Sequence, residues 1–397
     1  MDQSVAIIGL GYVGLPLAIA AAKSGYLVSG VDTNLSKVEA LNNGISVIED
    51  IPDSEIKEAI RKNSFKAGVT LNKLSGNSVY IICVPTPLDK TRNPDMSCVE
   101  DAARSVAKVM KAGDLVILES TVMPGATRNY LLPILENESG LHRDSFHLAF
   151  SPERIDPKNE YWRLDNTPKI VAGLNPNSRK LAVKFYSKFI KNIVECNSLE
   201  IAEAAKLLEN SFRLINISFI NELSVFCNLI GIEIAEVIKA ASTKPYGFMP
   251  FYPGIGIGGH CIPVDPIYLL ARSTELGFPL RMIDLAIQIN RQVPIFVIKR
   301  AEEKIGNLKN KEILVIGVAY KPNVSDIRES PVEALILELQ KQGAKVSWHD
   351  DLVKEWHGTS SVPLSDGYDL AILATPHDYL DLTKLGSVQI LDTRNSV

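Results

Sequence analysis

The chain has 397 residues, of which 46% are hydrophobic and 22% charged, with a mean hydropathy of +0.07, values typical of a globular protein with two or three domains. The 42 Lys and Arg against 46 Asp and Glu give a formal net charge of −4 at pH 7. No basic block predicts a nucleic-acid partner, and no apolar run approaches the roughly 20 residues that span a membrane.

The N-terminal stretch MDQSVAIIGLGYVG carries an acid instead of the basic start of a signal peptide, and its apolar part predicts a strand. The cysteines are odd in number and form no CxxC pair, which argues against a disulfide framework and fits a reducing cytoplasm. No second ligand pair with zinc spacing accompanies the adjacent His260 and Cys261. We therefore expect a cytoplasmic protein without a metal.

Short apolar runs alternate with helical patterns over the first 197 residues, which predicts a parallel sheet covered by helices on both faces. A helical pattern follows the first run and closes at Gly25. The predicted strands are residues 5–9, 28–32, 79–85, 115–120, 147–153, 169–173 and 192–196.

A GxGxxG motif, formed by Gly9, Gly11 and Gly14, lies between the first predicted strand and the first helix. Glycines at this spacing permit a tight turn, close approach of a pyrophosphate, and close packing of helix on strand. Asp32 ends the second strand, where an acid accepts hydrogen bonds from ribose hydroxyls and repels a 2′-phosphate. The pattern therefore predicts an NAD site.

A long helix is predicted between Asn197, which can form a capping box with Glu200, and Gly231. It has too many apolar positions for one stripe, so we expect burial on several sides and a second subunit against it. Lys206 and Asn210 project from one face of this helix. On pattern alone they are either a solvated pair or functional groups.

The stretch GIGIGGHCIPVD, residues 254–265, places Cys261 after two glycines, where a substrate could approach the thiol. A nearby ammonium such as that of Lys206 would favour the reactive thiolate. From the residues alone, the alternatives are a nucleophile and a structural thiol.

Helical patterns continue over residues 266–305, and a second α/β pattern follows. It consists of strands at 312–320, 345–350, 369–375 and 388–394 with a helix at 330–343. The predicted fold class is α/β, with two Rossmann-like doubly wound domains joined by a central helical region containing one long helix. The expected boundaries are 1–197, 198–305 and 306–397.

A dinucleotide site combined with a nucleophilic cysteine suggests a four-electron oxidation. An alcohol loses a hydride to give an aldehyde, a thiolate adds to it, and loss of a second hydride gives a thioester that water releases as an acid.

The chain resembles the UDP-glucose/UDP-N-acetylhexosamine 6-dehydrogenase family over essentially its whole length. The motifs that carry the resemblance appear in family order: GLGYVGLP, VPTP, ESTVMPG, SPERIDP, KLLEN, GGHCIPVDP and YKPNVSDIRESP. The resemblance implies an NAD-binding N-terminal domain, a central domain that forms a homodimer through its long helix, and a C-terminal UDP-sugar domain.

The resemblance also implies roles for individual residues. Cys261 matches the nucleophile, Lys206 the residue that stabilises the oxyanion, and Asn210 its companion on the sugar. Asp265 and Thr121 match residues that hold the catalytic water, and Glu153 matches the carboxylate of thioester hydrolysis. The cofactor would contact Gly9, Gly11, Tyr12, Val13, Gly14, Asp32, Pro85, Thr86, Ser120, Thr121 and Arg328. The substrate would contact Glu153, Arg154, Lys206, Asn210, Phe251, Tyr252, Gly258 and Lys321.

The motif SPER resembles the branch that oxidises UDP-N-acetylhexosamines, and UDP-N-acetylglucosamine is the expected substrate. UDP-glucose and UDP-N-acetylmannosamine are the alternatives for the same reaction. Two other functions stay open: a two-electron hydroxyacid-type dehydrogenase, which needs no cysteine, and a non-catalytic sensor of nucleotide sugars or NAD.

Overall fold

The computed structural model describes residues 4–155, 159 and 161–394. The chain folds into two compact units, one made of residues 1–208 and 267–275 and the other of residues 209–266 and 276–397. Among the described residues, no helix combines the length and the apolar character needed to cross a bilayer.

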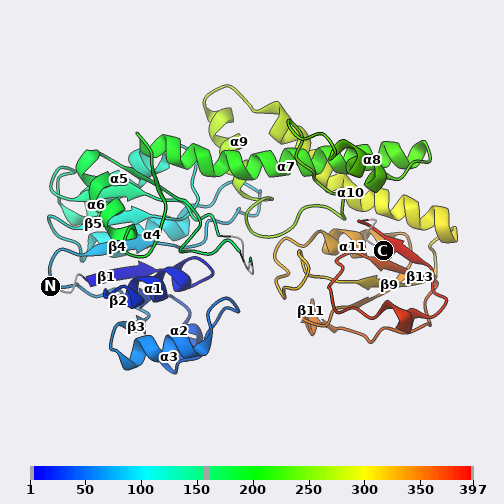
Figure 1. Ribbon diagram of the computed structural model, residues 1–397, viewed down its shortest axis with the longest axis horizontal. Coiled ribbons are helices and arrows are strands. Elements are labelled where there is room, and N and C mark those ends of the chain that lie inside the picture. The colour runs from blue at the N-terminus through cyan, green and yellow to red at the C-terminus, as the bar shows by residue number, and fades with distance from the viewer. Residues whose placement is uncertain (1–3, 156–158, 160, 395–397) are drawn as a thin grey trace. The chain divides into compact units, whose positions relative to one another are not determined.

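The first unit is built on a sheet that, over its described residues, has eight strands in the order β3-β2-β1-β4-β5-β6-β7-β8. These strands are β1 (Ser4–Ile8), β2 (Leu27–Val31), β3 (Phe65–Gly68), β4 (Val79–Ile82), β5 (Leu115–Leu118), β6 (His147–Phe150), β7 (Lys169–Gly173) and β8 (Ile193–Glu195). The order 3-2-1-4-5-6 is that of a dinucleotide-binding sheet. Figure 1 shows this unit at the left, in blue to green.

Every residue of β1, β4 and β5 is buried, as expected for central strands of a parallel sheet with helices on both faces. Neighbouring strands pair in parallel except β6 and β7, which run antiparallel; this differs from the all-parallel sheet expected from the sequence. Strand β3 was not predicted. Its sequence FKAG is too short to stand out, and its pairing with β2 places it in the sheet.

Helices of the first unit pack on this sheet, and the chain passes from its last strand into the long helix. The helices are α1 (Gly14–Lys23), α2 (Leu35–Asn42), α3 (Asp53–Arg61), α4 (Ser97–Ala107), the π-helix η1 (Thr127–Leu131), α5 (Leu132–Ser139), α6 (Pro176–Tyr186) and α9 (Asp265–Glu275). The predicted long helix is confirmed as α7 (Leu199–Leu229), 31 residues.

The second unit contains a parallel sheet with, over its described residues, four strands in the order β10-β9-β13-β14. They are β9 (Glu312–Ile316), β10 (Lys345–His349), β13 (Leu370–Leu373) and β14 (Ile390–Asp392). The other elements are α8 (Ile234–Ala241), α10 (Arg281–Ile305), α11 (Pro331–Lys341), β11 (Glu355–Trp356), β12 (Thr359–Ser360) and the 3-10 helix η2 (Leu382–Leu385). Figure 1 shows this sheet in orange to red, with α10 in yellow.

A two-residue hairpin turn joins β11 and β12 and was not predicted. His357 and Gly358 both have positive φ, 48° and 73°, which is the backbone of a type I′ turn. Trp356, which ends β11, packs edge-on against Trp348 with ring centroids 6.0 Å apart. This contact fixes the hairpin to the core below.

Helix α11 offers a matched test of where the second unit's core lies. Leu335 is 0% exposed and Leu337, two residues on, is 51% exposed. Leu335→Ala should lower the free energy of unfolding by about 2–5 kcal/mol, because it leaves a cavity in the core. Leu337→Ala should change it by less than about 0.5 kcal/mol. Urea unfolding followed by circular dichroism measures both, and equal losses would contradict this assignment of the core.

Candidate functional site

The glycine motif forms a turn at the carboxyl end of β1 that only glycine can make. Gly9 has φ of 95°, and a Cβ there would lie 2.5 Å from the carbonyl oxygen of Cys83. A Cβ on Gly14 would lie 1.8 Å from the carbonyl oxygen of Gly9. A Cβ on Gly11, by contrast, would meet nothing within 4 Å. The turn therefore leaves open space beside the N-terminus of α1, which fits the pyrophosphate of a dinucleotide.

Tyr12 and Val13 complete this turn. The Tyr12 hydroxyl donates to Glu49 Oε2 at 3.0 Å. Val13 directly precedes the first residue of α1.

Asp32 follows β2 at the same edge of the sheet. Its Oδ1 accepts from the Asn34 backbone N–H at 3.0 Å, and its Oδ2 accepts from the Leu10 N–H at 3.0 Å and from Lys37 Nζ at 2.9 Å. Partial burial works to raise the pKa of Asp32, but these hydrogen bonds outweigh it and lower the pKa below the ordinary value. The carboxylate is therefore ionised at neutral pH and ready to accept from ribose hydroxyls.

Lys37 was missed by the sequence analysis. It lies in the first turn of α2, where the side chain of Asn34 caps the helix by accepting from the Lys37 N–H at 3.1 Å. A basic residue five positions after Asp32 was the available signal. Its ammonium neutralises Asp32 where a cofactor's adenosine would bind.

Two further loops reach this edge from β4 and β5. Pro85 and Thr86 follow β4, and Ser120 and Thr121 follow β5. The Ser120 hydroxyl donates to the carbonyl oxygen of Val84 at 2.7 Å, which ties the two loops together. These four residues therefore gather at the carboxyl ends of adjacent strands, where a parallel sheet binds its ligand.

Glu203 on α7 holds the loop that continues from Thr121. Its carboxylate accepts from the backbone N–H groups of Gly125 at 2.6 Å and Thr127 at 2.9 Å. Burial raises the pKa of Glu203, and the hydrogen bonds from Thr127 and Gly125 offset part of that rise. The sequence analysis did not single out this residue, because an acid on a helix gives no pattern by itself.

Glu153 follows β6 and is held by its own neighbours. Its Oε1 accepts from the backbone N–H groups of Arg154 at 2.6 Å and Ile155 at 2.5 Å. The Nζ of Lys169 lies 3.7 Å from its Oε2. The Arg154 side chain donates to the carbonyl oxygen of Pro168 at 2.6 Å. Residues 156 and 157, the end of the motif SPERIDP, lie outside the described residues.

The KLLEN motif places Lys206 and Asn210 one turn apart on α7, and both side chains are buried. Asn210 Nδ2 donates to Asp265 Oδ2 at 2.6 Å. Asp265 begins α9, and its backbone N–H donates to the carbonyl oxygen of Cys261 at 2.8 Å. The second unit therefore brings together three of the predicted catalytic residues.

The loop that carries Cys261 lies against the segment 320–331. A Cβ on Gly258 would lie 2.8 Å from the carbonyl oxygen of Glu329, and one on Gly259 would lie 2.7 Å from the Tyr320 ring. Gly259 also has φ of 86°, and its N–H donates to the carbonyl oxygen of Arg328 at 3.0 Å. These glycines are required for the loop to approach its neighbour.

Cys261 is exposed, whereas Cys83 and Cys227 are buried and Cys98 and Cys196 are partly buried. Burial lowers the pKa of the adjacent His260, and the charge of Arg328 lowers it further. The imidazole is therefore neutral at neutral pH. It brings no positive charge to the thiol.

The other predicted substrate residues lie in the second unit. Phe251 packs edge-on against Phe212 with ring centroids 5.7 Å apart, and Tyr252 is exposed. Lys321 follows Tyr320 in the segment that receives the cysteine loop and is partly buried. Arg328 pairs with Asp326 through its Nε at 2.9 Å.

The second sheet has an acid at the position of Asp32, but its environment differs. Asp350 follows β10 and accepts from the Val318 and Leu352 N–H groups, each at 2.9 Å, and lies 3.2 Å from His377 Nε2. Burial opposes ionisation, but these hydrogen bonds outweigh it and lower the pKa of Asp350 to about 2. Its oxygens serve the fold, so this sheet does not repeat the ribose site of the first.

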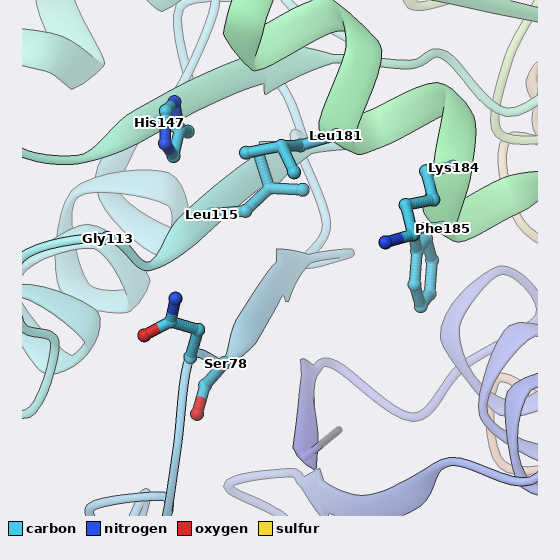
Figure 2. A pocket seen from close by; sticks show the side chains of 8 residues that line it. Ser78, Gly113, Leu115, His147, Leu181, Lys184 and Phe185 are labelled. Atoms are coloured by element: carbon cyan, nitrogen blue, oxygen red, sulfur yellow. The ribbon is translucent and has the colours of Figure 1, made fainter. Parts of the chain in front are cut away.

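A cavity of about 400 Å³ lies at the other edge of the first sheet (Figure 2). It opens where β4, β5 and β6 begin, whereas the glycine turn lies where β1 ends, so the cavity is distinct from the cofactor edge. Its lining residues are Asn77, Ser78, Gly113, Leu115, His147, Leu181, Lys184 and Phe185. Among the described residues, no group of three His, Cys, Asp or Glu side chains could hold a metal ion.

Comparisons with known proteins agree with this geometry. Sequence profiles of the UDP-glucose/GDP-mannose dehydrogenase family match its NAD-binding domain at residues 3–190, its central domain at 200–292 and its UDP-binding domain at 314–397. A UDP-N-acetyl-D-glucosamine 6-dehydrogenase of Pseudomonas aeruginosa is 36% identical over 389 residues, 95% of this chain and 91% of that protein.

A UDP-N-acetyl-D-mannosamine dehydrogenase of Pyrococcus horikoshii is 37% identical over 380 residues, 94% of this chain and 89% of that protein. A solved structure of a UDP-D-ManNAc dehydrogenase from Pyrococcus horikoshii superimposes with a TM-score of 0.91 at 34% identity, covering 100% of this chain and 96% of that one. The glycine turn, the ionised Asp32 and these matches show that the chain is an NAD-dependent oxidoreductase belonging to the UDP-glucose/GDP-mannose dehydrogenase family.

Proposed function

We propose that this enzyme oxidises the C6 hydroxyl of UDP-N-acetylglucosamine to a carboxylate through a thioester on Cys261. The observation that carries the proposal is the exposed thiol in a glycine loop, directly joined to the Asn210–Asp265 pair. An NAD-dependent dehydrogenase needs no thiol to carry out a two-electron oxidation. A thiol becomes necessary when an aldehyde must be oxidised further.

Each step follows from the chemistry of a side chain. NAD⁺, when bound, accepts one hydride from C6 in each of two oxidations. In the first, the hydroxyl proton passes to a water held by Asp265 and Thr121. The Cys261 thiolate then adds to the aldehyde carbon, and loss of the second hydride leaves a C6 thioester. Water attacks that carbon, its proton passes to Glu153, and the C–S bond breaks to return the thiolate and release the acid.

Lys206 and Asn210 act on the oxygen at C6. A protonated lysine stabilises the oxyanion of the thiohemiacetal and of the hydrolysis intermediate, and it favours the thiolate form of Cys261. The hydrogen bond from Asn210 to Asp265 leaves the Asn210 carbonyl oxygen to accept from a sugar hydroxyl.

The C2 group of the sugar is the finer part of the proposal. It rests on the motif SPER, residues 151–154, in which Arg154 lies beside Glu153. The substrate would also contact Phe251, Tyr252 and Lys321. UDP-N-acetylmannosamine is the second candidate, because the relative named for that sugar is as similar as the one named for UDP-N-acetylglucosamine, at 37% against 36% identity.

We also propose that the enzyme is a homodimer through α7. Large apolar side chains lie exposed along one side of this helix at Phe212, Phe219 and Phe226. At 100° per residue these positions fall within an arc of about 40°. An apolar stripe of this kind is typical of a surface covered by another helix, and a second copy offers the same stripe.

The stoichiometry of the reaction tests the covalent route. With UDP-N-acetylglucosamine the enzyme should release two NADH for each sugar converted, measured at 340 nm beside chromatography of the products. Cys261→Ser should lower the rate of acid formation by at least about 1,000-fold, because a hydroxyl does not replace the thiolate. Cys98→Ser, in a partly buried cysteine of α4, is the control and should act like the unchanged enzyme.

A release of one NADH per sugar, or undiminished acid formation by Cys261→Ser, would point to a two-electron dehydrogenase instead. Tight sugar-nucleotide binding with no NADH at all would indicate a sensor. Assays with UDP-N-acetylmannosamine and UDP-glucose in parallel decide the sugar, because the true substrate should give the highest kcat/KM.

Asp32 should set the choice of cofactor. Asp32→Ser removes the acceptor for the ribose hydroxyls and leaves Lys37 free to meet a 2′-phosphate. We expect kcat/KM to fall about 10- to 100-fold with NAD⁺ and to rise with NADP⁺. Glu39→Gln, on the exposed side of the same helix α2, should change neither value. An unchanged preference in Asp32→Ser would remove Asp32 from the cofactor site.

The apolar stripe should fail as an interface when it carries a charge. Phe219→Glu should weaken self-association by about 100-fold or more, because burying an unpaired carboxylate is costly. Sedimentation velocity at micromolar protein measures the shift to monomer. Leu337→Glu changes an equally exposed leucine on α11 and should leave the assembly intact. A monomeric unchanged enzyme would contradict the homodimer.

A further inference from the structure

A buried group of charged and polar side chains lies next to Glu153 and has no part in the chemistry described so far. Glu119 directly follows β5, Lys169 is the first residue of β7 and Tyr186 is the last residue of α6. Their side chains are buried, with exposed fractions of 1%, 4% and 0% respectively. The Lys169 ammonium donates to Glu119 Oε2 at 3.0 Å. The Tyr186 hydroxyl donates to the other oxygen of Glu119. We call these three residues the lysine cluster.

The lysine cluster and Glu153 together hold two carboxylates and one ammonium. Lys169 Nζ lies 3.7 Å from Glu153 Oε2 and 3.0 Å from Glu119 Oε2, so one positive charge serves both acids. A lysine as deeply buried as Lys169 is rare in proteins, because lysines are almost never fully buried unless they are paired. Its place is therefore set by the two acids.

The two oxygens of Glu153 have different surroundings. Oε1 accepts two backbone hydrogen bonds, from Arg154 and Ile155. Oε2 is buried and, among the described residues, has no hydrogen-bond partner, with the Lys169 ammonium just beyond hydrogen-bonding distance. Oε1 thus fixes the orientation of the carboxylate, and Oε2 lies on its buried side, against the Lys169 ammonium.

The charge states of the cluster follow from burial and from one another. Burial works to lower the pKa of Lys169, but the charges of Glu119 and Glu153 outweigh it and raise the pKa, so the ammonium stays protonated. Burial raises the pKa of Glu119, and Lys169 offsets part of that rise. Burial also raises the pKa of Tyr186 well above its ordinary value, so this phenol stays neutral.

Two more titratable side chains face this region. Cys83 follows β4, and burial raises the pKa of its thiol well above the ordinary value, so it carries no charge at neutral pH. The Arg154 guanidinium is directed to the carbonyl oxygen of Pro168 by its 2.6 Å hydrogen bond. Among the described residues, Lys169 is therefore the cation whose ammonium lies against Oε2.

We propose that Lys169 is a positioning residue whose charge, acting from the buried side at Oε2, stabilises the Glu153 carboxylate that accepts a proton from the water that hydrolyses the thioester. Glu119 and Tyr186 hold the ammonium in place. This inference rests on the proposed function of Glu153. In the step concerned, the water oxygen bonds to C6, one water proton passes to the Glu153 carboxylate, and the C–S electron pair returns to Cys261.

A purely structural ion pair would also occupy this place, so the test must use a readout that stability alone does not move. Lys169→Met keeps the length and bulk of the side chain and removes its charge. The two hydride transfers do not need Glu153 and should persist as a rapid burst of two NADH per active site. Turnover after the burst should fall about tenfold or more at pH 7, because the Glu153 carboxylate then lacks the neighbouring cation that stabilises it.

The pH profile of the steady-state rate shows in which direction each variant moves the acid limb. A base works only when ionised, so its loss of a neighbouring cation should move the acid limb of kcat to higher pH, by about one unit or more. Glu119→Gln should move the limb the other way, to lower pH, because the ammonium then serves Glu153 alone. Lys169→Arg keeps the charge and should restore most of the rate. Lys184→Met, an exposed lysine of α6, is the matched control and should match the unchanged enzyme.

The double variant Lys169→Met with Glu119→Gln removes both charges and guards against misfolding of the single variant; it should keep the limb shifted to higher pH. One result would overturn the proposal. The Lys169→Met variants would keep the acid limb of the unchanged enzyme, accumulate no thioester after the burst, and differ only by a lowered Tm. If both Met-containing variants fail to fold, Glu119→Gln decides it, with Lys169→Arg as the control that keeps the charge: an unmoved limb in Glu119→Gln contradicts the role. Failure of the proposed function is separate, because the unchanged enzyme would then show no release of two NADH per sugar.

Discussion

The close contact between the cysteine loop and the segment 320–331 is the constraint on which the proposed site depends. At Gly258 and Gly259 the backbone approaches Tyr320 and Glu329 so closely that a Cβ would lie 2.7–2.8 Å from their atoms. This contact fixes the chain immediately before Cys261. Directly after it, the turn into α9 brings in Asp265 and, through Asp265, Asn210. A thiol in a glycine-rich loop is thereby held at both ends.

The first unit places several carboxylates at the edge of a buried sheet, and each of them has a partner. Asp32 is matched by Lys37, Glu203 by two backbone N–H groups, and Glu119 with Glu153 by Lys169. Each buried or half-buried carboxylate thus has a donor that offsets the cost of desolvation. Asp32, a proposed cofactor ligand, and Glu153, the proposed base, are both among these acids.

Much of the fold could be predicted from the sequence, because buried parallel strands are continuous apolar runs and the long helix has clear signals at both ends. The strands around the glycine motif, α7 and the four strands of the second sheet were all expected. Strand β3, the β11–β12 hairpin and the antiparallel β6–β7 pair were not. They depend on pairing with distant residues, which a local pattern does not encode.

The candidate site could be predicted for residues that lie in motifs and not for those that support them. Cys261, the glycines of the turn, Asn210 and Asp265 all lie in motifs that the sequence displays, and their roles stay predictions. Lys37, Glu203, Glu119 and Lys169 were missed, because their role depends on what lies opposite them in the folded chain. Lys169, for example, is 50 residues from Glu119 along the chain and 3.0 Å from it in space.

The most direct test of the account is to trap the covalent intermediate. The Glu153→Gln enzyme, incubated with UDP-N-acetylglucosamine and NAD⁺, can be quenched in acid, digested, and its peptides weighed by mass spectrometry. The account predicts that the peptide containing Cys261 carries the uronic acyl group of the sugar nucleotide as a thioester. An unmodified Cys261 in every peptide, while the uronic acid still forms at an undiminished rate, would contradict it.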